Sequence, residues 1–216
     1  MCCSFCIVAT VTDVPVRLAE VRNMPESLPQ LLRSDARENR DRIVEAARSL
    51  FSERGIEVGM REIARRAEVG PATLYRRFPT RHILVSEVFA EEMLTCRQIV
   101  EDGWADPDAW RGFRSIVGRV SILNAGNRGF VDAFMAAGPE MESITAHRVS
   151  LLRMVAELAS RAQAAGGLRE DFVIEDFVLI VRAQRGLGSG DEAAARRFAA
   201  LVIDGLRARP TNPDST

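Results

Sequence analysis

The sequence predicts an all-α protein of about nine helices, in which a three-helix head is followed by a larger helical lobe. Apolar residues recur at helical spacing along most of the chain, and no segment shows the alternation of a strand. Residues 61–78, REIARRAEVGPATLYRRF, combine two short helical patterns around a tight turn, which is the layout of a helix-turn-helix. With 216 residues, 47% of them apolar, the chain can bury a sizeable core in one or two domains.

Residues 1–33 are expected to form a disordered extension, because they show no sustained period and contain three prolines. Ser34 or Asp35 can cap a first helix that runs to about Arg54, where Gly55 ends it. The apolar residues of this helix follow the spacing of a single buried stripe. They are Ile43, Ala46, Ala47, Leu50 and Phe51.

The helix-turn-helix is expected to follow directly. The second helix of the head covers about Met60–Ala67, and residues 68–70 make the turn. Pro71 occupies the first position of the third helix, where a missing N–H costs nothing, and that helix ends at Phe78. Thr80 can cap a fourth, longer helix through about Glu101. The candidate core residues of the fourth helix are Ile83, Leu84, Val88, Met93 and Leu94.

The second lobe is also predicted to be helical. A start signal at residues 106–108, Asp-Pro-Asp, precedes a helix with apolar residues at helical spacing. Further helices are expected over residues 130–136, 139–165, 174–185 and 192–208. The predicted domains are therefore a head at 34–82 with its motif at about 60–79, a C-terminal domain at 83–209 and a disordered tail at 210–216.

Basic residues concentrate around the predicted motif. From Arg33 to His82 there are twelve arginines and eight acidic residues, a balance of +4; the whole chain carries −1, which leaves −5 for the rest. A basic lobe beside a mildly acidic one is typical of a DNA-facing head. All 29 basic residues are arginine, so every charged phosphate contact must use a guanidinium.

The third helix is the candidate DNA reader. Leu74 and Phe78, at i and i+4, are expected to face inward, which leaves the positions between them exposed. The Tyr75 hydroxyl suits a backbone phosphate, and adjacent arginines can bind phosphates or the guanine edge. Arg81, in the first turn of the next helix, can reach the flanking backbone. The predicted DNA-binding residues are Arg61, Gly70, Pro71, Thr73, Tyr75, Arg76, Arg77 and Arg81.

Three consecutive segments, IVEAARSLFSERG, REIARRAEVGPATLYRRF and PTRHIL, closely resemble the N-terminal domain of TetR-family transcriptional regulators. The resemblance covers about residues 37–88, a quarter of the chain. By position, Thr73, Tyr75, Arg77 and Arg81 match family residues that usually touch DNA. Glu68 stands where the family usually has Gly, which predicts strain if the turn needs a positive φ there.

The resemblance implies a cytoplasmic, sequence-specific repressor that binds a palindromic operator as a homodimer and is released by a small molecule. The last two helices would form the dimer interface, through Phe177, Ile180, Val181, Phe198, Val202 and Leu206. The ligand pocket would lie between helices of the C-terminal domain, with the fourth helix coupling it to the head. Its candidate walls are Trp110, Phe113, Val117, Phe130, Phe134, Met135, Leu151, Met154 and Val155, with polar groups from Asn124, Asn127 or His147. For both sets the alternative is ordinary intramolecular core.

Other function classes find little support in the sequence. It contains no Gly-rich phosphate loop, no G-x-S-x-G and no H-E-x-x-H, so neither an enzyme nor a cofactor or metal is expected. Cys3 and Cys6 form a C-x-x-C without a second pair, and a redox- or metal-responsive DNA-binding regulator using this segment is the alternative function. A start at Met24 would remove that segment altogether. No apolar run approaches the roughly 18 residues of a membrane span.

Overall fold

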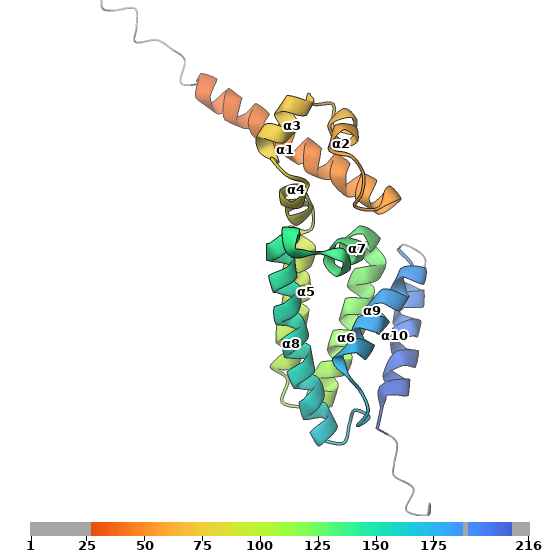
Figure 1. Ribbon diagram of the computed structural model, residues 1–216. Helices are drawn as coiled ribbons and strands as arrows, with labels where there is room; N and C mark the ends of the chain where they lie inside the picture. The colour runs from red at the N-terminus through yellow and green to blue at the C-terminus, as the bar shows by residue number, and fades with distance from the viewer. Residues whose placement is uncertain (1–26, 188–189, 209–216) are drawn as a thin grey trace, which may run out of the picture. The chain divides into compact units, whose positions relative to one another are not determined.

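The computed structural model describes residues 27–187 and 190–208, and these form helices joined by short connections (Figure 1). The chain divides into a short unit, Met1–Glu38, and a large unit, Asn39–Thr216. Within the described residues there are ten α-helices and two 3₁₀ turns, and no strand is present. The predicted all-α class is therefore confirmed, with a helix count close to the predicted one.

The first helix, α1 (Ser27–Arg54), begins before the predicted start at Ser34. The prediction of an extension through residue 33 is therefore wrong for residues 27–33. Pro29 does not prevent this helix, because it lies in the first turn, where its missing N–H needs no partner. The rest of the predicted extension, residues 1–26, and the predicted tail at 210–216 lie outside the described residues.

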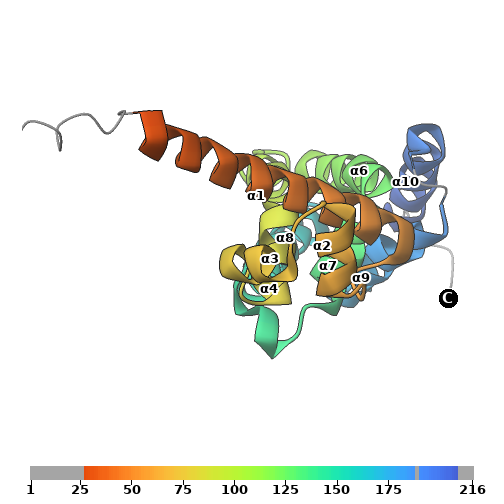
Figure 2. The ribbon, with the colours of Figure 1, turned by 90° about the horizontal axis from the view of Figure 1, so that it is seen from above.

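Two short helices complete the head: α2 (Met60–Arg66) and α3 (Pro71–Arg77). Figure 2 shows both of them beside the C-terminal part of α1. The predicted stripe of α1, residues 43–51, is buried at all five apolar positions, and Ile63 of α2 and Leu74 of α3 are fully buried in the same core. Each head helix thus contributes one apolar face to a shared core.

The predicted fourth helix is interrupted at Phe89, which separates α4 (Arg81–Val88) from α5 (Ala90–Trp104). Thr80 caps α4 as predicted, since its hydroxyl accepts a hydrogen bond from the Ile83 amide. The break changes which residues face the core. Ile83 is 47% exposed and Leu94 66% exposed, so these two predicted core positions are wrong.

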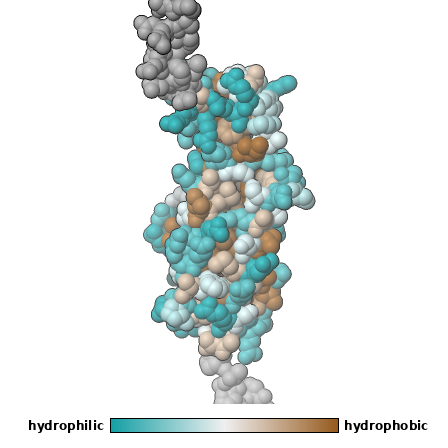
Figure 3. Space-filling view, turned by 90° about the vertical axis from the view of Figure 1, so that its left-hand side faces the viewer, coloured by the Kyte–Doolittle hydropathy of each residue, from teal (hydrophilic) through white to brown (hydrophobic). Residues whose placement is uncertain are grey.

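The large unit continues with five helices: α6 (Ala109–Gly126), α7 (Arg128–Ala136), α8 (Glu142–Ala164), α9 (Ile174–Ala183) and α10 (Glu192–Leu206). The central helix is α6, which packs against α5, α8 and α10. Glycine allows the closest of these approaches, because a Cβ on Gly112 would lie 2.1 Å from the carbonyl oxygen of Gly103. On the face seen in Figure 3, hydrophobic side chains are scattered among hydrophilic ones.

Candidate functional site

The helix-turn-helix presents α3 with one face buried and one face exposed. Leu74 and Phe78 are buried, as predicted, while Tyr75 is 46% exposed and Arg76 and Arg77 lie at the surface beside it. Gly70 is the N-cap of the helix, and Pro71 follows it at the predicted first position. The exposed face therefore carries one phenol and two guanidinium groups.

Arginines of the head divide into two groups by their partners. On α1 and α2, Arg54 donates to Glu62 at 2.5 Å, and Arg66 lies 3.3 Å from Glu53. Arg76 and Arg77 form no ion pair with another described residue. Their charge therefore remains available for an external anion, whereas Arg54 and Arg66 are partly neutralised within the head.

Arg81 occupies a different environment from the exposed arginines of α3. Its guanidinium donates to the carbonyl oxygen of Ile56 at 2.5 Å and to that of Glu57 at 3.3 Å. The Glu57 carboxylate lies 3.5 Å away. Arg81 thus ties the start of α4 to the loop between α1 and α2, and its predicted DNA contact stays a prediction.

Glu68, which stands where the family usually has Gly, lies in the turn between α2 and α3. Glu68 has φ of 54°, and it is the one non-glycine residue with a positive φ among the described residues. Its backbone therefore occupies the left-handed region, as the sequence predicts for a position where glycine is usual.

We expect Glu68→Gly to raise the free energy of unfolding by about 0.5–1 kcal/mol, because relief of the left-handed strain outweighs the extra entropy of the unfolded chain. Urea denaturation followed by circular dichroism measures this change. Glu170→Gly is the matched control, since Glu170 is an exposed turn residue without positive φ. A destabilised Glu68→Gly protein would show that Glu68 is not strained.

A polar cluster connects α1 to the helices that follow the head. Arg48 of α1 donates to the carboxylate of Glu92 on α5 and to the carbonyl of Val88. Asn127, which precedes α7, donates to the same carboxylate oxygen of Glu92 at 2.7 Å. The second Glu92 oxygen is buried without a hydrogen-bond partner among the described residues. Glu92 therefore joins three separate segments of the chain.

Aromatic rings run beside this cluster from α1 toward α7. The Phe89 ring lies 6.0 Å from Phe51 of α1 and 5.9 Å from Phe130 of α7, and Phe130 lies 5.3 Å from Phe134. At the start of α7, a Cβ on Gly129 would lie 3.1 Å from the Phe51 carbonyl oxygen. Helix α7 thus packs directly on the C-terminal end of α1.

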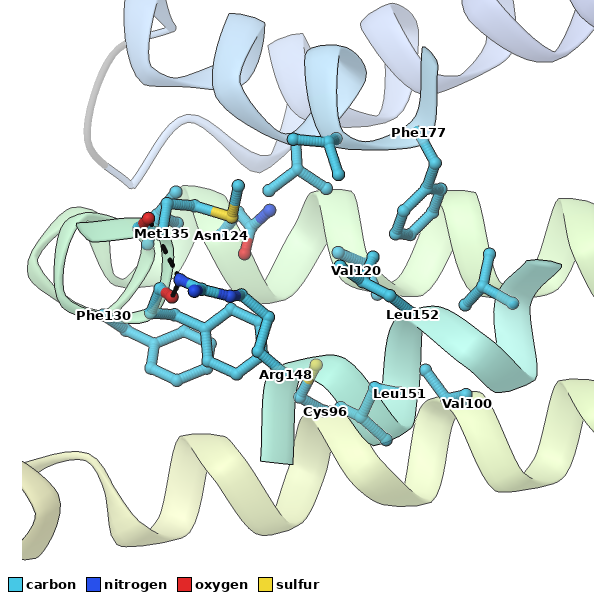
Figure 4. A pocket seen from close by; sticks show the side chains of 15 residues that line it. Cys96, Val100, Val120, Asn124, Phe130, Met135, Arg148, Leu151, Leu152 and Phe177 are labelled. Atoms are coloured by element: carbon cyan, nitrogen blue, oxygen red, sulfur yellow. Dashed lines mark hydrogen bonds between the residues drawn. The ribbon is translucent and has the colours of Figure 1, made fainter. Parts of the chain in front are cut away.

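An interior cavity of about 40 Å³ lies among α5, α6, α7, α8 and α9 (Figure 4). Five of the predicted wall residues line it, namely Phe130, Phe134, Met135, Leu151 and Val155. The polar candidate Asn124 also lines it, whereas Asn127 and His147 do not. The sequence did not indicate Cys96, Val100, Val120, Val131, Arg148, Leu152 or Val178, which complete the wall together with Phe177 and Val181.

The other four predicted wall residues, Trp110, Phe113, Val117 and Met154, do not line this cavity. Trp110, Phe113 and Val117 precede Val120 and Asn124, the residues of α6 that line the cavity. Met154 lies on another face of α8 than its neighbours Leu151, Leu152 and Val155, which do line it. Phe113 is fully buried against Phe172, with ring centroids 5.2 Å apart, and stacks on Trp110. Trp110, Phe113 and Phe172 form a packed aromatic cluster nearer the start of α6.

Arg148 is the charged member of the cavity wall. It could have been noticed in the sequence, because it lies four residues after Ile144 and three before Leu151, on the apolar stripe of α8. Its guanidinium donates to the carbonyl oxygens of Phe134 at 2.6 Å, Met135 at 3.0 Å and Ala137 at 3.0 Å. Arg148 therefore caps the C-terminal end of α7.

The predicted dimer residues fall into different environments. Phe177 and Leu206 are buried within the chain itself, which makes both wrong as exposed interface residues. Phe177 fills the cavity wall beside Phe113, and the Leu206 carbonyl accepts the Arg169 amide at 3.0 Å. The remaining four predicted residues, Ile180, Val181, Phe198 and Val202, are partly exposed. Leu179 and Leu201, which the prediction missed, are the most exposed large apolar residues on α9 and α10.

The described residues offer little for metal or redox chemistry. No group of three metal-ligating side chains comes together within residues 27–187 and 190–208. Cys96 is a buried free thiol in that range, and burial raises its pKa to about 11, which keeps it protonated and unreactive near neutral pH. Cys3 and Cys6 lie outside the described residues. None of the helices in these ranges has the length and apolarity to span a membrane.

A short arginine-bearing helix, held by a tight turn on a three-helix core, defines a helix-turn-helix DNA-binding protein. The family model "Bacterial regulatory proteins, tetR family" matches residues 43–88, and the model "Transcriptional regulator SbtR-like, C-terminal domain" matches residues 113–208. The chain belongs to the TetR family. It is accordingly a DNA-binding transcriptional regulator and not an enzyme.

Individual relatives agree with this assignment. The chain is 28% identical over 174 residues to the HTH-type transcriptional repressor KstR of Mycobacterium tuberculosis, a match that covers 76% of this chain and 75% of KstR. An HTH-type transcriptional regulator of Staphylococcus aureus is 41% identical over 63 residues, which cover 29% of this chain and 34% of that protein. The crystal structure of the TetR-family regulator PfmR from Thermus thermophilus has the same fold, with a TM-score of 0.62, 20% identity and coverage of 77% of this chain and all of PfmR.

Proposed function

We propose that this protein is a repressor that binds a palindromic operator as a homodimer and leaves it when a small molecule enters the cavity. The observation that carries the DNA-binding part is the exposed face of α3, where Tyr75, Arg76 and Arg77 project beside buried Leu74 and Phe78. Repression is supported by the relative KstR, which is a transcriptional repressor. Chromosomal DNA as the target favours a cytoplasmic location.

The proposal can be tested with a duplex selected from a random-sequence library. We expect the purified protein to enrich a palindrome, because two copies of α3 related by a two-fold axis read two equal half-sites. Fluorescence anisotropy then measures binding to that duplex in the presence of a small-molecule panel. Enrichment of a single, non-repeated site would contradict the dimer, and binding unchanged by every compound would contradict ligand release.

The dimer interface is proposed on α9 and α10. Leu179 and Leu201 are 64% and 54% exposed in a single chain, although large apolar residues gain free energy when buried. Phe198 and Val202 lie partly exposed on the same helix as Leu201. A second copy of the chain would cover these side chains and continue the core.

We expect Leu201→Arg to convert the protein to monomers, because two buried arginines would face each other across a two-fold axis. Size-exclusion chromatography with light scattering measures the oligomeric state. The control is Val149→Arg, which places the same charge on α8 at a position of similar exposure, 50%. Two variants with the same mass in solution would contradict the proposed interface.

The proposed switch couples the cavity to the head. The predicted fourth helix was expected to do both tasks, but they fall on two helices: α4 supports the head, while α5 lines the cavity through Cys96 and Val100. Helix α7 contacts both regions, since Phe130 lines the cavity and also packs on Phe89. Movement of α7 on ligand entry would therefore reach α1 directly. The shift cannot exceed the difference in ligand affinity between the two states.

A further inference from the structure

The cavity wall carries a positive charge without a negative partner. Of the described residues that line it, Arg148 alone has a charged side chain, and Asn124 is the other strongly polar one. Arg148 forms no ion pair with another described residue, and its guanidinium donates to three neutral carbonyl oxygens at the end of α7. The rest of the wall consists of Cys96 and apolar side chains.

An unpaired guanidinium beside an apolar cavity favours a particular kind of ligand. Carbonyl dipoles satisfy its hydrogen bonds but supply no net charge, so a carboxylate entering the cavity would gain a charge-assisted, two-pronged contact. An ammonium group would instead face like charge, and an uncharged ligand would gain no ion pair. The remaining apolar wall suits a hydrocarbon body.

We propose that the cavity binds a small apolar carboxylate, whose anionic group pairs with Arg148 and whose hydrocarbon part contacts Phe130, Val120 and Leu151. Figure 4 shows these three side chains and Arg148 around the same space. This proposal rests on the proposed ligand-released function and adds the chemical class of the ligand.

The size of the cavity links binding to movement. Its volume of about 40 Å³ is well below the roughly 150 Å³ of a cavity that holds benzene, so the walls must separate to admit such a ligand. A carboxylate on Arg148 competes for the donors that hold the carbonyls of Phe134, Met135 and Ala137. Binding therefore loosens the end of α7, the helix that packs on α1 through Gly129.

Calorimetric titration of the full-length protein at pH 7.5 tests the ligand class with three probes of equal chain length: octanoate, octan-1-ol and octylamine. We expect octanoate to bind at least about tenfold more tightly than either of the others, as one charge-assisted contact predicts. Arg148→Gln should lose this preference, and Arg148→Lys should keep part of it. Arg153→Gln, which removes an exposed charge from the same helix, should behave as the wild type.

The wild-type comparison needs no variant, so the test stands even if Arg148→Gln folds poorly. Equal binding of octan-1-ol or octylamine would overturn the proposal, as would a carboxylate preference that survives in Arg148→Gln or the absence of octanoate binding. If an uncharged or cationic compound releases the selected duplex while octanoate does not bind, the ligand class is wrong and the ligand-released function stands. Release by no compound at all would instead count against that function.

Discussion

Substituting Phe89 by alanine is expected to lower the free energy of unfolding by about 3–5 kcal/mol, the range for a buried phenylalanine. The ring is almost fully buried and lies between Phe51 of α1 and Phe130 of α7. The space left by the ring cannot be closed by a shift of α7 toward α1, because α7 already meets the α1 backbone at Gly129. Urea denaturation monitored by circular dichroism measures the loss.

Leu94→Ala provides the control for this experiment. Phe89 lies at the start of α5 and Leu94 lies within the same helix, but the Leu94 side chain is largely exposed. Truncating Leu94 should therefore change the free energy of unfolding by no more than about 0.5 kcal/mol. If Phe89→Ala lowers the free energy of unfolding by less than about 1 kcal/mol, the interface between α1 and α7 must relax to fill the space left by the ring. That result would contradict a rigid connection between α7 and the head.

Removing both exposed arginines of α3 is expected to weaken DNA binding about 100-fold, since each charge-assisted contact contributes about tenfold. The variant is Arg76→Ala/Arg77→Ala, and fluorescence anisotropy with the selected duplex measures the change. Because neither arginine is paired with another described residue, their loss should leave the fold intact.

The matched control for the α3 double variant removes the same charge elsewhere. Arg97→Ala/Arg153→Ala takes two exposed arginines from α5 and α8, away from the proposed DNA-binding helix. We expect its DNA affinity to stay within about twofold of the wild type. Equal losses for the two double variants would indicate that overall charge, rather than α3, determines binding.

Local sequence patterns were sufficient to predict several features of the head. The stripe of α1, the proline at the start of α3 and the cap at Thr80 each depend on residues within a turn or two of one another. The strain at Glu68 was also predictable, because the turn imposes its φ locally. The interruption at Phe89 was not, since it depends on packing against α1 and α7, which are distant in the sequence.

The cavity could be predicted only in part, for a related reason. Phe113 and Phe130 are both apolar residues on helices of the same lobe, and only the packing of α7 and α9 decides that Phe130 lines the cavity and Phe113 does not. Phe177 illustrates the same ambiguity, because an amphipathic stripe does not reveal whether its partner is the same chain or a second copy. Long-range packing therefore determines the cavity, whereas local rules determine the DNA-binding helices.

The salt dependence of duplex binding tests the central claim, that α3 contacts DNA phosphates through its exposed arginines. If Arg76 and Arg77 each neutralise one phosphate, the slope of log affinity against log salt concentration should be shallower by about 1.8 in Arg76→Ala/Arg77→Ala than in the wild type. The Arg97→Ala/Arg153→Ala control should keep the wild-type slope. A slope that is unchanged in the α3 variant would contradict the account, because binding would then not involve these two guanidinium groups and phosphate.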